Sequence, residues 1–393
     1  MLNTPHSPVA IVVGLCAHGV GMVRSLHRAG VPVLALEANL ALPGVRTRCA
    51  EVRIVPDING EGLIDALVKL ASDTPEAQDG VLLLTNDKMV EIVGRHAALV
   101  SRHFRLSWGH AATALLPLLA KDRIEARCRE VGLDYPTSVL LTRFDDAPRA
   151  LADLAFPVIA KPTRPVSAFK TQVSASIDAF MGARRRMEGS MPLVVQEFIP
   201  GNDSAIRFGA LYLDHGRVLA RFEGRKLRSR PMGHTTIAVS EPDDEVHALA
   251  CRFFEGLELS GPASLELKRD PAGKYWVIEP TVGRTDFWAG LCAANGVDLT
   301  LIEYAAMAGR HLPPTTQRRT HLWINGDRDP AALLWLLRNA PGQIMAARVK
   351  GVYLDLHDGG PSLVSAGRFL GAIPGRIVRR GLRAIASTRG EKR

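Results

Sequence analysis

The chain has 393 residues, 47% of them hydrophobic, which is enough material for two or three domains with their own cores. Its 35 glycines and 25 prolines fit a loop-rich α/β protein and argue against a disordered chain. Five widely spaced cysteines without a CxxC motif argue against a disulfide framework or a zinc site and fit a reducing cytosol. The net charge of +9 favours anionic partners: a nucleotide, a nucleic acid or a membrane surface.

The first residues do not have the features of a targeting segment. The N-terminus lacks a basic region, and its apolar run is short and ends at Gly14, so we expect a first core strand rather than a signal peptide. No apolar stretch reaches the roughly 18 to 20 residues that a membrane-spanning helix needs. These features predict a cytoplasmic protein.

Residues 1–110 are predicted to form a small parallel-sheet domain. A continuous apolar run at 9–14 is typical of a strand buried on both faces, and it is followed by a helical pattern with a glycine stop. Strand and helix patterns then alternate, as they do in a parallel sheet. The predicted elements after the first strand and helix are a strand at 31–37, a helix at 60–74, a strand at 80–87 and a helix at 87–104.

A glycine-rich segment after the first strand has two interpretations. Gly19 and Gly21 match the dinucleotide pattern G-x-G-x-x-G, but Arg24 stands where the third glycine normally allows close packing. With Glu37 as a ribose ligand, the segment would suit a nicotinamide-dependent oxidoreductase. Alternatively, Gly14 and Gly19 make only a tight strand-to-helix turn, whose helix N-terminus suits an anion.

The middle of the chain predicts mixed α+β structure. A helical stretch at 115–132 precedes a short strand that ends at Lys161 and an apolar strand that enters a turn near residue 200. Alternating segments at 204–231 predict an antiparallel meander that turns at Asp214–Gly216. A helix at 243–258 and a hairpin at 263–280, turned over "DPAGK", complete this part.

The hairpin carries two carboxylates that its turn can bring together. Glu266 lies on the first strand and Glu279 on the second. Two adjacent acids repel each other unless a cation lies between them, and a hard divalent ion with oxygen ligands suits such a pair. The spacing alone equally allows two solvent-facing residues neutralised by neighbouring basic residues of the hairpin, Lys268, Arg269 or Lys274.

Three lysines favour the first interpretation. Lys161 ends an apolar strand just before a proline, Lys121 lies near the end of an apolar helical run, and Lys226 lies in a basic segment. Lysines of this kind together with a carboxylate pair are typical of a polyphosphate held between cations and a metal ion.

The motifs "FPVIAKP", "VVQEFIPGND" and "EPTVGRTDFW", together with the lysines and the carboxylate pair, resemble the ATP-grasp superfamily of carboxylate–amine ligases over about residues 9–310. The resemblance implies an α/β fold, α+β in the ATP-grasp part. It divides the chain into a Rossmann-like pre-ATP-grasp domain at 1–110, a small lobe with a linker helix at 111–192, a large lobe with the metal site at 193–312, and a C-terminal extension at 313–393.

The resemblance also implies ATP and Mg²⁺, or Mn²⁺, as cofactors and assigns residues to them. The nucleotide ligands are Lys121, Lys161, Gln196, Glu197, Ile199, Asp203 and Lys226. The metal ligands are Glu266, Glu279 and Thr281, and the residues next to the reacting groups are Arg284, Lys226 and Arg228, with Arg230 as a further candidate.

Two departures from the family pattern bear on these assignments. Thr281 stands where the family usually has asparagine, and Arg284 comes one place late, so the sequence leaves one or two metal ions open. The loop after Lys161 lacks the usual phosphate-covering glycines, for which Ser167 and Lys170 are candidate substitutes.

The implied reaction is an ATP-dependent ligation of small molecules, and no nucleic-acid partner is expected. ATP phosphorylates a carboxylate, and an amine or similar nucleophile displaces phosphate from the acyl phosphate, which leaves ADP and phosphate as products. The alternatives are the oxidoreductase described above and a non-catalytic nucleotide-binding member of the fold.

The C-terminal tail is basic and partly apolar. From Gly375 onward, Ile377, Val378, Leu382 and Ile385 can form one stripe surrounded by arginines. This stripe either packs on the body of the protein or draws the chain to anionic lipid at the inner membrane face.

Overall fold

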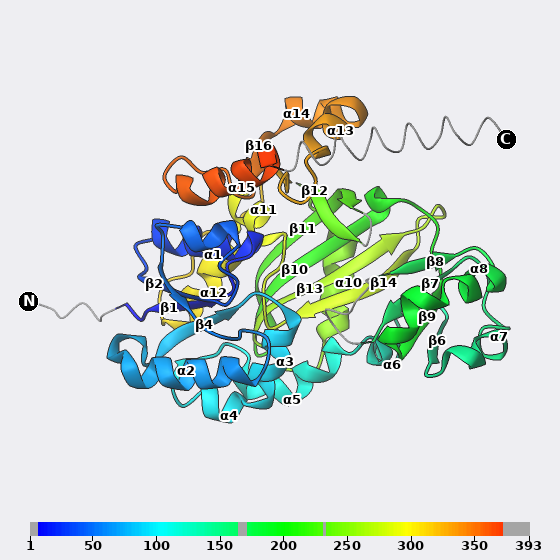
Figure 1. Cartoon of the computed structure of the whole chain (residues 1–393), viewed down its shortest axis with the longest axis horizontal. Coiled ribbons are helices and arrows are strands. Elements are labelled where there is room, and N and C mark those ends of the chain that lie inside the picture. The colour runs from blue at the N-terminus through cyan, green and yellow to red at the C-terminus, as the bar shows by residue number, and fades with distance from the viewer. Residues whose placement is uncertain (1–6, 164–170, 231–232, 372–393) are drawn as a thin grey trace, which may run out of the picture.

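The N-terminal part of the molecule is a five-stranded parallel sheet with the order β3-β2-β1-β4-β5. The computed structural model describes residues 7–163, 171–230 and 233–371 (Figure 1). The strands are β1 (Ala10–Val13), β2 (Val33–Glu37), β3 (Glu51–Ile54), β4 (Gly80–Leu84) and β5 (Phe104–Arg105). The helices between them are α1 (Ala17–Arg28), α2 (Glu61–Asp73), α3 (Asp87–Arg95) and α4 (Ala97–Val100).

Both faces of this sheet are buried, which explains its continuous apolar strands. In β1, Ile11 and Val13 belong to the cluster under α2 and α3, whereas Ala10 and Val12 pack with α1 and with Tyr304. Residues at alternate positions of a strand point to opposite faces, so a strand covered on both sides must be apolar throughout. The predicted parallel sheet is therefore confirmed, although the predicted helix at 87–104 breaks at His96 and ends in strand β5.

A four-stranded antiparallel sheet with the order β6-β9-β7-β8 forms a small lobe at the far end of the molecule from the N-terminal sheet (Figure 1). Its own core of buried side chains includes Leu141, Phe180 and Val195. Its elements are β6 (Ser138–Leu141), α7 (Ala147–Ala150), β7 (Val158–Pro162), β8 (Gln172–Ser174), α8 (Ile177–Gly182), α9 (Arg184–Met187) and β9 (Leu193–Glu197).

A seven-stranded sheet with the order β14-β13-β10-β11-β12-β15-β16 lies between these two parts. The predicted meander and the predicted hairpin are both confirmed as antiparallel neighbours in it. Its strands are β10 (Ile206–Asp214), β11 (Arg217–Arg230), β12 (His234–Ser240), β13 (Gly261–Arg269), β14 (Tyr275–Val282), β15 (His321–Ile324) and β16 (Arg348–Gly351). The helices that pack with it or follow it are α10 (Asp244–Phe254), α11 (Ala289–Ala294), α12 (Leu299–Met307), α13 (Ala332–Asn339), α14 (Pro341–Ala346) and α15 (Gly359–Gly371).

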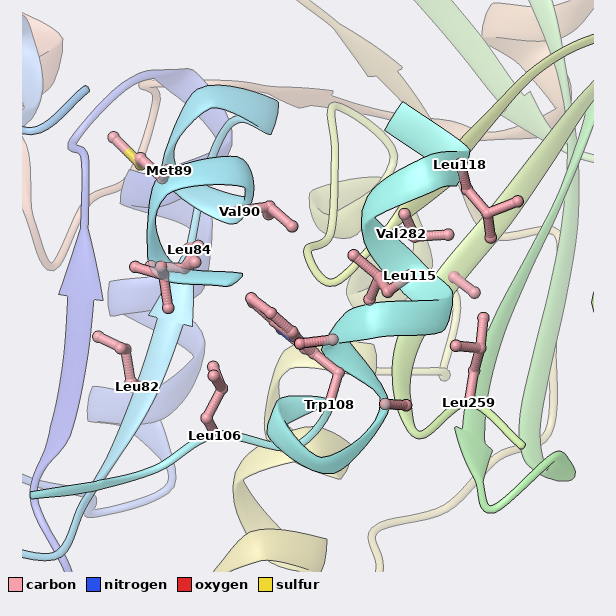
Figure 2. Close-up of a cluster of buried hydrophobic side chains, with 14 of the residues drawn as sticks. Leu82, Leu84, Met89, Val90, Leu106, Trp108, Leu115, Leu118, Leu259 and Val282 are labelled. Atoms are coloured by element: carbon pink, nitrogen blue, oxygen red, sulfur yellow. The ribbon is translucent and has the colours of Figure 1, made fainter. Parts of the chain in front are cut away.

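One hydrophobic cluster joins the N-terminal sheet to the large sheet. Figure 2 shows Trp108 between Leu82 and Leu106 on one side and Leu115 and Val282 on the other. Trp108 is 1% exposed, and removing such an aromatic side chain from water is among the larger single contributions to a core. The two sheets therefore share one core.

The connection to the small lobe differs from its prediction. The predicted helix at 115–132 is interrupted: α5 (Ala112–Leu115) and a 3₁₀ turn containing Pro117 end at Ala120, whose backbone is extended. A new helix, α6 (Lys121–Glu130), then begins. Proline disfavours a continuous helix through its position. Lys121 consequently follows the apolar helical run, as predicted, and is the first residue of the next helix.

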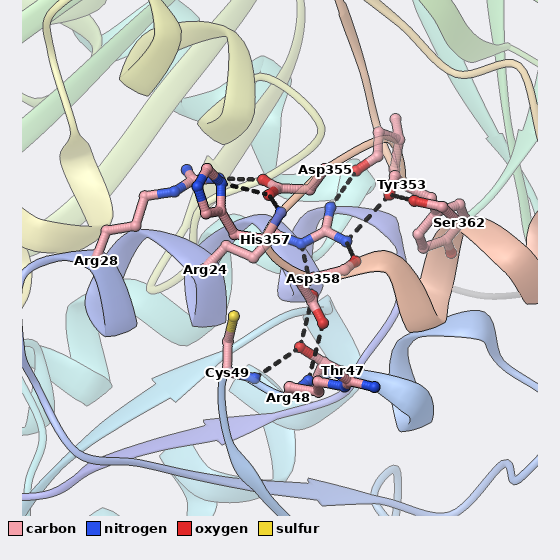
Figure 3. Close-up of polar contacts among 11 residues, drawn as sticks. Arg24, Arg28, Thr47, Arg48, Cys49, Tyr353, Asp355, His357, Asp358 and Ser362 are labelled. Carbon is pink, nitrogen blue, oxygen red and sulfur yellow. Dashed lines mark hydrogen bonds and ion pairs between the residues drawn. The ribbon is translucent and has the colours of Figure 1, made fainter.

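The C-terminal segment contacts both the large sheet and the N-terminal part of the molecule. Strands β15 and β16 extend the large sheet, while α15 packs against the 3₁₀ turn at Pro43–Arg46 in the N-terminal part. Figure 3 shows the polar contacts at this junction, where Arg24 Nε lies 2.8 Å from Asp358 Oδ2. Asp358 also accepts hydrogen bonds from Thr47 and from the backbone N–H of Arg48, each 2.8 Å long.

Among the described residues, no helix is long and apolar enough to cross a membrane. The C-terminal stripe at 377–385, Ser167 and Lys170 lie outside the described residues.

Candidate active site

The two carboxylates of the hairpin lie directly opposite each other. Glu266 on β13 and Glu279 on β14 are register partners in the antiparallel ladder, next to a bulge at Glu266/Leu267. Partners in such a ladder carry their side chains on the same face of the sheet. The predicted side-by-side arrangement is therefore confirmed.

Each of these carboxylates pairs with one of the lysines singled out in the sequence. Lys226 Nζ lies 2.5 Å from Glu266 Oε1, and Lys121 Nζ lies 2.9 Å from Glu279 Oε1. The Glu279 carboxylate raises the pKa of Lys121, against the effect of burial. The alternative partners Lys268, Arg269 and Lys274 make cation–π contacts with the rings of Phe198, Tyr275 and Trp276 respectively.

A divalent ion fits this donor set in part. Thr281 is two residues beyond Glu279 and pairs in register with Ser264, whose buried Oγ has no hydrogen-bond partner among the described residues. The described part of the chain contains no group of three or more His, Cys, Asp or Glu side chains that could hold a metal ion. The protein thus offers two carboxylates and two hydroxyls, and an ion here would need further oxygen ligands from phosphate or water.

The small lobe carries its candidate nucleotide ligands on one face. Lys161 pairs in register with Val194, and Ile159 pairs with Gln196, so Lys161 and Gln196 point to the face opposite the lobe's buried core. Gln196 is 1% exposed, and its Nε2 atom has no hydrogen-bond partner among the described residues. A buried amide of this kind is suited to a ligand with a hydrogen-bond acceptor.

The segment that links the small lobe to the large sheet holds the other three candidates. The Glu197 side chain accepts a hydrogen bond of 3.0 Å from the backbone of Ala155. Ile199 is half-buried just beyond β9. Asp203 Oδ2 accepts a 2.8 Å bond from the backbone N–H of Ser229 on β11, which connects the linking segment to the strand that carries Lys226.

Arg284 lies past the end of β14 between two acids that the sequence did not single out. Its Nε is 2.6 Å from Asp87 Oδ1, and its Nη1 is 3.1 Å from Asp286 Oδ2. Burial lowers the pKa of Arg284, but the two carboxylates more than offset this and raise it. Gly283 lets the chain before Arg284 pass close to Val90 of α3, because it has φ +70° and a Cβ there would lie only 3.0 Å from the Val90 side chain.

The two further arginine candidates contact the C-terminal segment. Arg228 Nε bonds Asp329 Oδ2 at 2.6 Å, and its guanidinium lies over the ring of Trp335. Arg230 donates to the backbone carbonyl of Arg328. The structure therefore brings Lys121, Lys226, Glu266 and Glu279 together, and it turns Arg228 and Arg230 toward the C-terminal segment.

The dinucleotide interpretation loses its ribose ligand. Glu37 is 1% exposed, and its carboxylate accepts the backbone N–H groups of Leu15, Ala38 and Asn39 at 2.6, 2.8 and 2.9 Å. A Cβ at Gly19 would overlap the carbonyl of Gly14. Both observations favour the alternative in which the glycines make a tight turn.

Comparison with known proteins finds ligases among the sequence relatives of the chain. No protein-family model matches the chain. It is 23% identical over 317 residues to a D-aspartate ligase of Enterococcus faecium strain Aus0004, covering 74% of each chain. It is 25% identical over 213 residues to a D-alanine–D-alanine ligase of Nitrosococcus oceani, covering 51% of this chain and 66% of that protein.

Solved structures share the fold. A structure of the ADP complex of N5-carboxyaminoimidazole ribonucleotide synthetase superposes with a TM-score of 0.65 at 14% identity, over 84% of this chain and 85% of that one. An L-amino acid ligase from Bacillus licheniformis gives a TM-score of 0.56 at 16% identity, over 76% and 73%. These sequence relatives and structural neighbours are ATP-grasp carboxylate–amine ligases, and the chain shares their fold, as the resemblance found in its sequence implies.

Proposed function

We propose that the chain joins an amino acid, activated at its carboxylate, to an amine through an acyl phosphate, with Glu266 and Glu279 at the reaction centre. The observation that supports this most directly is the pair of adjacent carboxylates, each in contact with a lysine. Phosphoryl transfer from ATP needs groups of this kind, because catalysis of it rests on positioning and charge neutralisation.

The residues divide into three roles in this proposal. Lys161 and Gln196 on the small lobe, with Asp203 in the linking segment, bind ATP, and Lys121 and Lys226 release their glutamates to contact phosphate oxygens. Glu266, Glu279 and Thr281 hold Mg²⁺ or Mn²⁺, which would neutralise the phosphate charge when bound. The remaining roles, nucleotide contacts by Glu197 and Ile199 and a contact of Arg228 with the reacting groups, are proposed on the resemblance alone.

Arg284 has the substrate role in the proposal. Its guanidinium is positioned just beyond the metal strand and would bind the carboxylate before transfer and the acyl phosphate after it. Amino acids are the proposed substrate class because two sequence relatives and one structural neighbour carry them in their names.

The test is an ADP-release assay with Mg²⁺ and D-aspartate, L-aspartate, D-alanine and L-alanine, singly and in pairs. We expect ADP release that depends on an amino acid and is abolished by EDTA. A matched assay with hydroxylamine as the nucleophile detects the acyl phosphate as a hydroxamate. Nucleotide binding without ADP release or hydroxamate would instead support a non-catalytic member of the fold.

A cytoplasmic location, with contact at the inner membrane face through the tail, remains a proposal from the sequence. Of the basic tail, only Arg368 is described, and it donates to the backbone carbonyl of Ala41.

A further inference from the structure

A second cluster of titratable side chains lies beside Arg284 and outside the lysine–glutamate site. Cys16 and His18 stand at the start of α1, Asp87 is the first residue of α3, and Asp286 follows β14. Cys16 Sγ is 3.4 Å from His18 Nδ1, and Arg284 bonds both acids. His18 interacts electrostatically with both Arg284 and Asp286. Three separate elements thus converge at the residue proposed to hold the acyl phosphate.

Of the two imidazole nitrogens of His18, only one has a hydrogen-bond partner among the described residues. Nδ1 contacts the Cys16 sulfur, whereas Nε2 is buried and has no hydrogen-bond partner among the described residues. A buried polar atom without a partner costs free energy, and its presence in a folded protein calls for a ligand or an ordered water. The Nε2 atom therefore lacks a partner that a bound ligand or an ordered water would supply.

The ligation step requires a group with the properties of His18. An amine reaches the enzyme mainly as an ammonium ion and must lose a proton before its lone pair can attack. Aspartates are too weak as bases and arginine holds its proton too firmly, so of the cluster only the cysteine and the histidine titrate near neutral pH.

The surroundings shift the pKa values of both His18 and Cys16 toward neutral pH. Burial lowers the pKa of His18, but the Cys16 thiolate and the Asp286 carboxylate raise it, Arg284 opposes them, and the net direction is upward. Burial raises the pKa of Cys16, yet His18 and hydrogen bonds from Gly19 and Thr85 bring it down to about 7. Burial raises the pKa of Tyr353, and the charges of Asp327 and Cys16 add to this rise.

We propose that His18 is a catalytic residue of the ligation step: its Nε2 takes a proton from the ammonium group of the second substrate, and Cys16 positions the ring through Nδ1. The amine nitrogen then forms a bond to the acyl carbon, the bond from that carbon to the phosphate oxygen breaks, and phosphate leaves with the electron pair. The nitrogen's second proton leaves with the phosphate. This role rests on the proposed ligase function.

The test separates formation of the acyl phosphate from attack by the amine. Hydroxylamine is largely unprotonated at neutral pH and needs no base, whereas D-alanine, L-alanine and ammonium do. With D-aspartate or L-aspartate as the carboxylate, we expect His18→Gln to form hydroxamate within about twofold of the wild type. Amide formation should fall by about 100-fold or more, the usual contribution of a general base. His27→Gln, an exposed site on the same helix, is the matched control.

Two results would overturn the proposal. One is equal loss of hydroxamate and amide in His18→Gln with an unchanged thermal midpoint, which would place His18 in the first half-reaction. The other is a wild-type enzyme that forms hydroxamate but no amide from any of the three amines. Absence of hydroxamate from the wild type would instead refute the proposed ligase function itself.

The positioning role of Cys16 has its own readout. A base acts in its unprotonated form, so amide formation should rise with pH as His18 loses its proton. Removing the sulfur in Cys16→Ala takes away the group that raises the pKa of His18, so the midpoint of this rise should move to lower pH. Hydroxamate formation should keep its pH profile. An unchanged midpoint for amide formation would contradict a role for Cys16.

Discussion

Each glutamate of the candidate active site pairs with a lysine, so binding of a nucleotide there would have to replace these ion pairs. Without ligand, Lys226 and Lys121 neutralise Glu266 and Glu279. In the proposed function a divalent ion would bind those carboxylates and a triphosphate would bind those lysines, so joint binding of metal and ATP would exchange both partners at once. Neither charge is then left without a partner, which would be costly at the nearly buried Lys226.

Glu279→Gln keeps the shape of the side chain and removes its charge. We expect Mg²⁺-dependent ADP release to fall at least about 100-fold, because a charge aimed at the transferring phosphoryl group is lost. Adenine nucleotide binding, measured by calorimetry without Mg²⁺, should remain. Glu245→Gln, an exposed site on α10, is the control. Turnover near the wild-type level would show that Glu279 holds no metal.

Glu303 predicts a pH dependence of stability. It is buried on α12 with Ser107 Oγ as its hydrogen-bond partner, and desolvation raises its pKa to about 8. Between pH 4.5, its ordinary value, and pH 8, the folded state keeps a proton that the unfolded state has lost. Stability from this group is therefore complete below pH 4.5 and falls as pH rises toward 8.

The measurement is the thermal midpoint from pH 5 to 8 for the wild type and Glu303→Gln. We expect the midpoint of the wild type to decline more steeply with pH than that of the variant, which cannot ionise. Parallel curves would mean that Glu303 is ionised in the folded protein.

Contacts between residues could be predicted from the sequence only where the two residues are close together along the chain. Glu266 and Glu279 flank one short turn, so their pairing follows from the hairpin itself. Asp87 and Arg284 are 197 positions apart, and neither acid beside Arg284 has a local pattern that distinguishes it from a solvated one. His18 was not predicted as a site residue for the same reason: its segment was interpreted only through its glycine pattern.

Whole elements were predicted best where a buried face imposes a period. The strands of the N-terminal sheet and the meander follow from their apolar patterns. Strand β3 was missed, because its residues at the sheet edge are exposed or half-buried. The helix break before Lys121 was not predicted, because the apolar pattern continues through Pro117, which interrupts the helix.

The C-terminal helix provides a test at this scale. Arg24 and Asp358 form a buried pair with further hydrogen bonds from Thr47 and Arg48, whereas Arg28 pairs with Asp355 through a side chain that is 53% exposed. We expect Asp358→Ala to cost about 3 kcal/mol of unfolding free energy, because it leaves a buried arginine without its partner.

Arg28→Ala is the matched control, and it should cost less than about 1 kcal/mol, as exposed ion pairs do. Chemical denaturation measures both variants. Hydrogen exchange in Asp358→Ala should increase first in β16 and α15. Equal costs for the two variants would show that the Asp358 contacts do not hold this segment in place.

For the whole molecule, we expect the basic C-terminal tail to bind anionic membranes. Truncation after Gly371 leaves α15 (Gly359–Gly371) intact and removes only the basic stripe. We expect the full chain to co-sediment with vesicles containing phosphatidylserine at low salt and to lose this binding at high salt. The truncated chain should stay in the supernatant. If the full chain ignores these vesicles at low salt, the tail is a packing or solubility element.

The path of the C-terminal segment has a mechanical consequence. It adds two strands to the large sheet, and its helix α15 and Asp358 contact the Pro43–Arg46 turn and Arg24 of the N-terminal part. It therefore connects two parts that already share a core around Trp108. The small lobe has a separate core, so it can move as one body relative to the two sheets that share a core. We therefore expect any closure over ATP to be a rotation of the small lobe, Ser138–Glu197, relative to the rest of the molecule. A change in the distance between one label on the small lobe and one on the large sheet should report it.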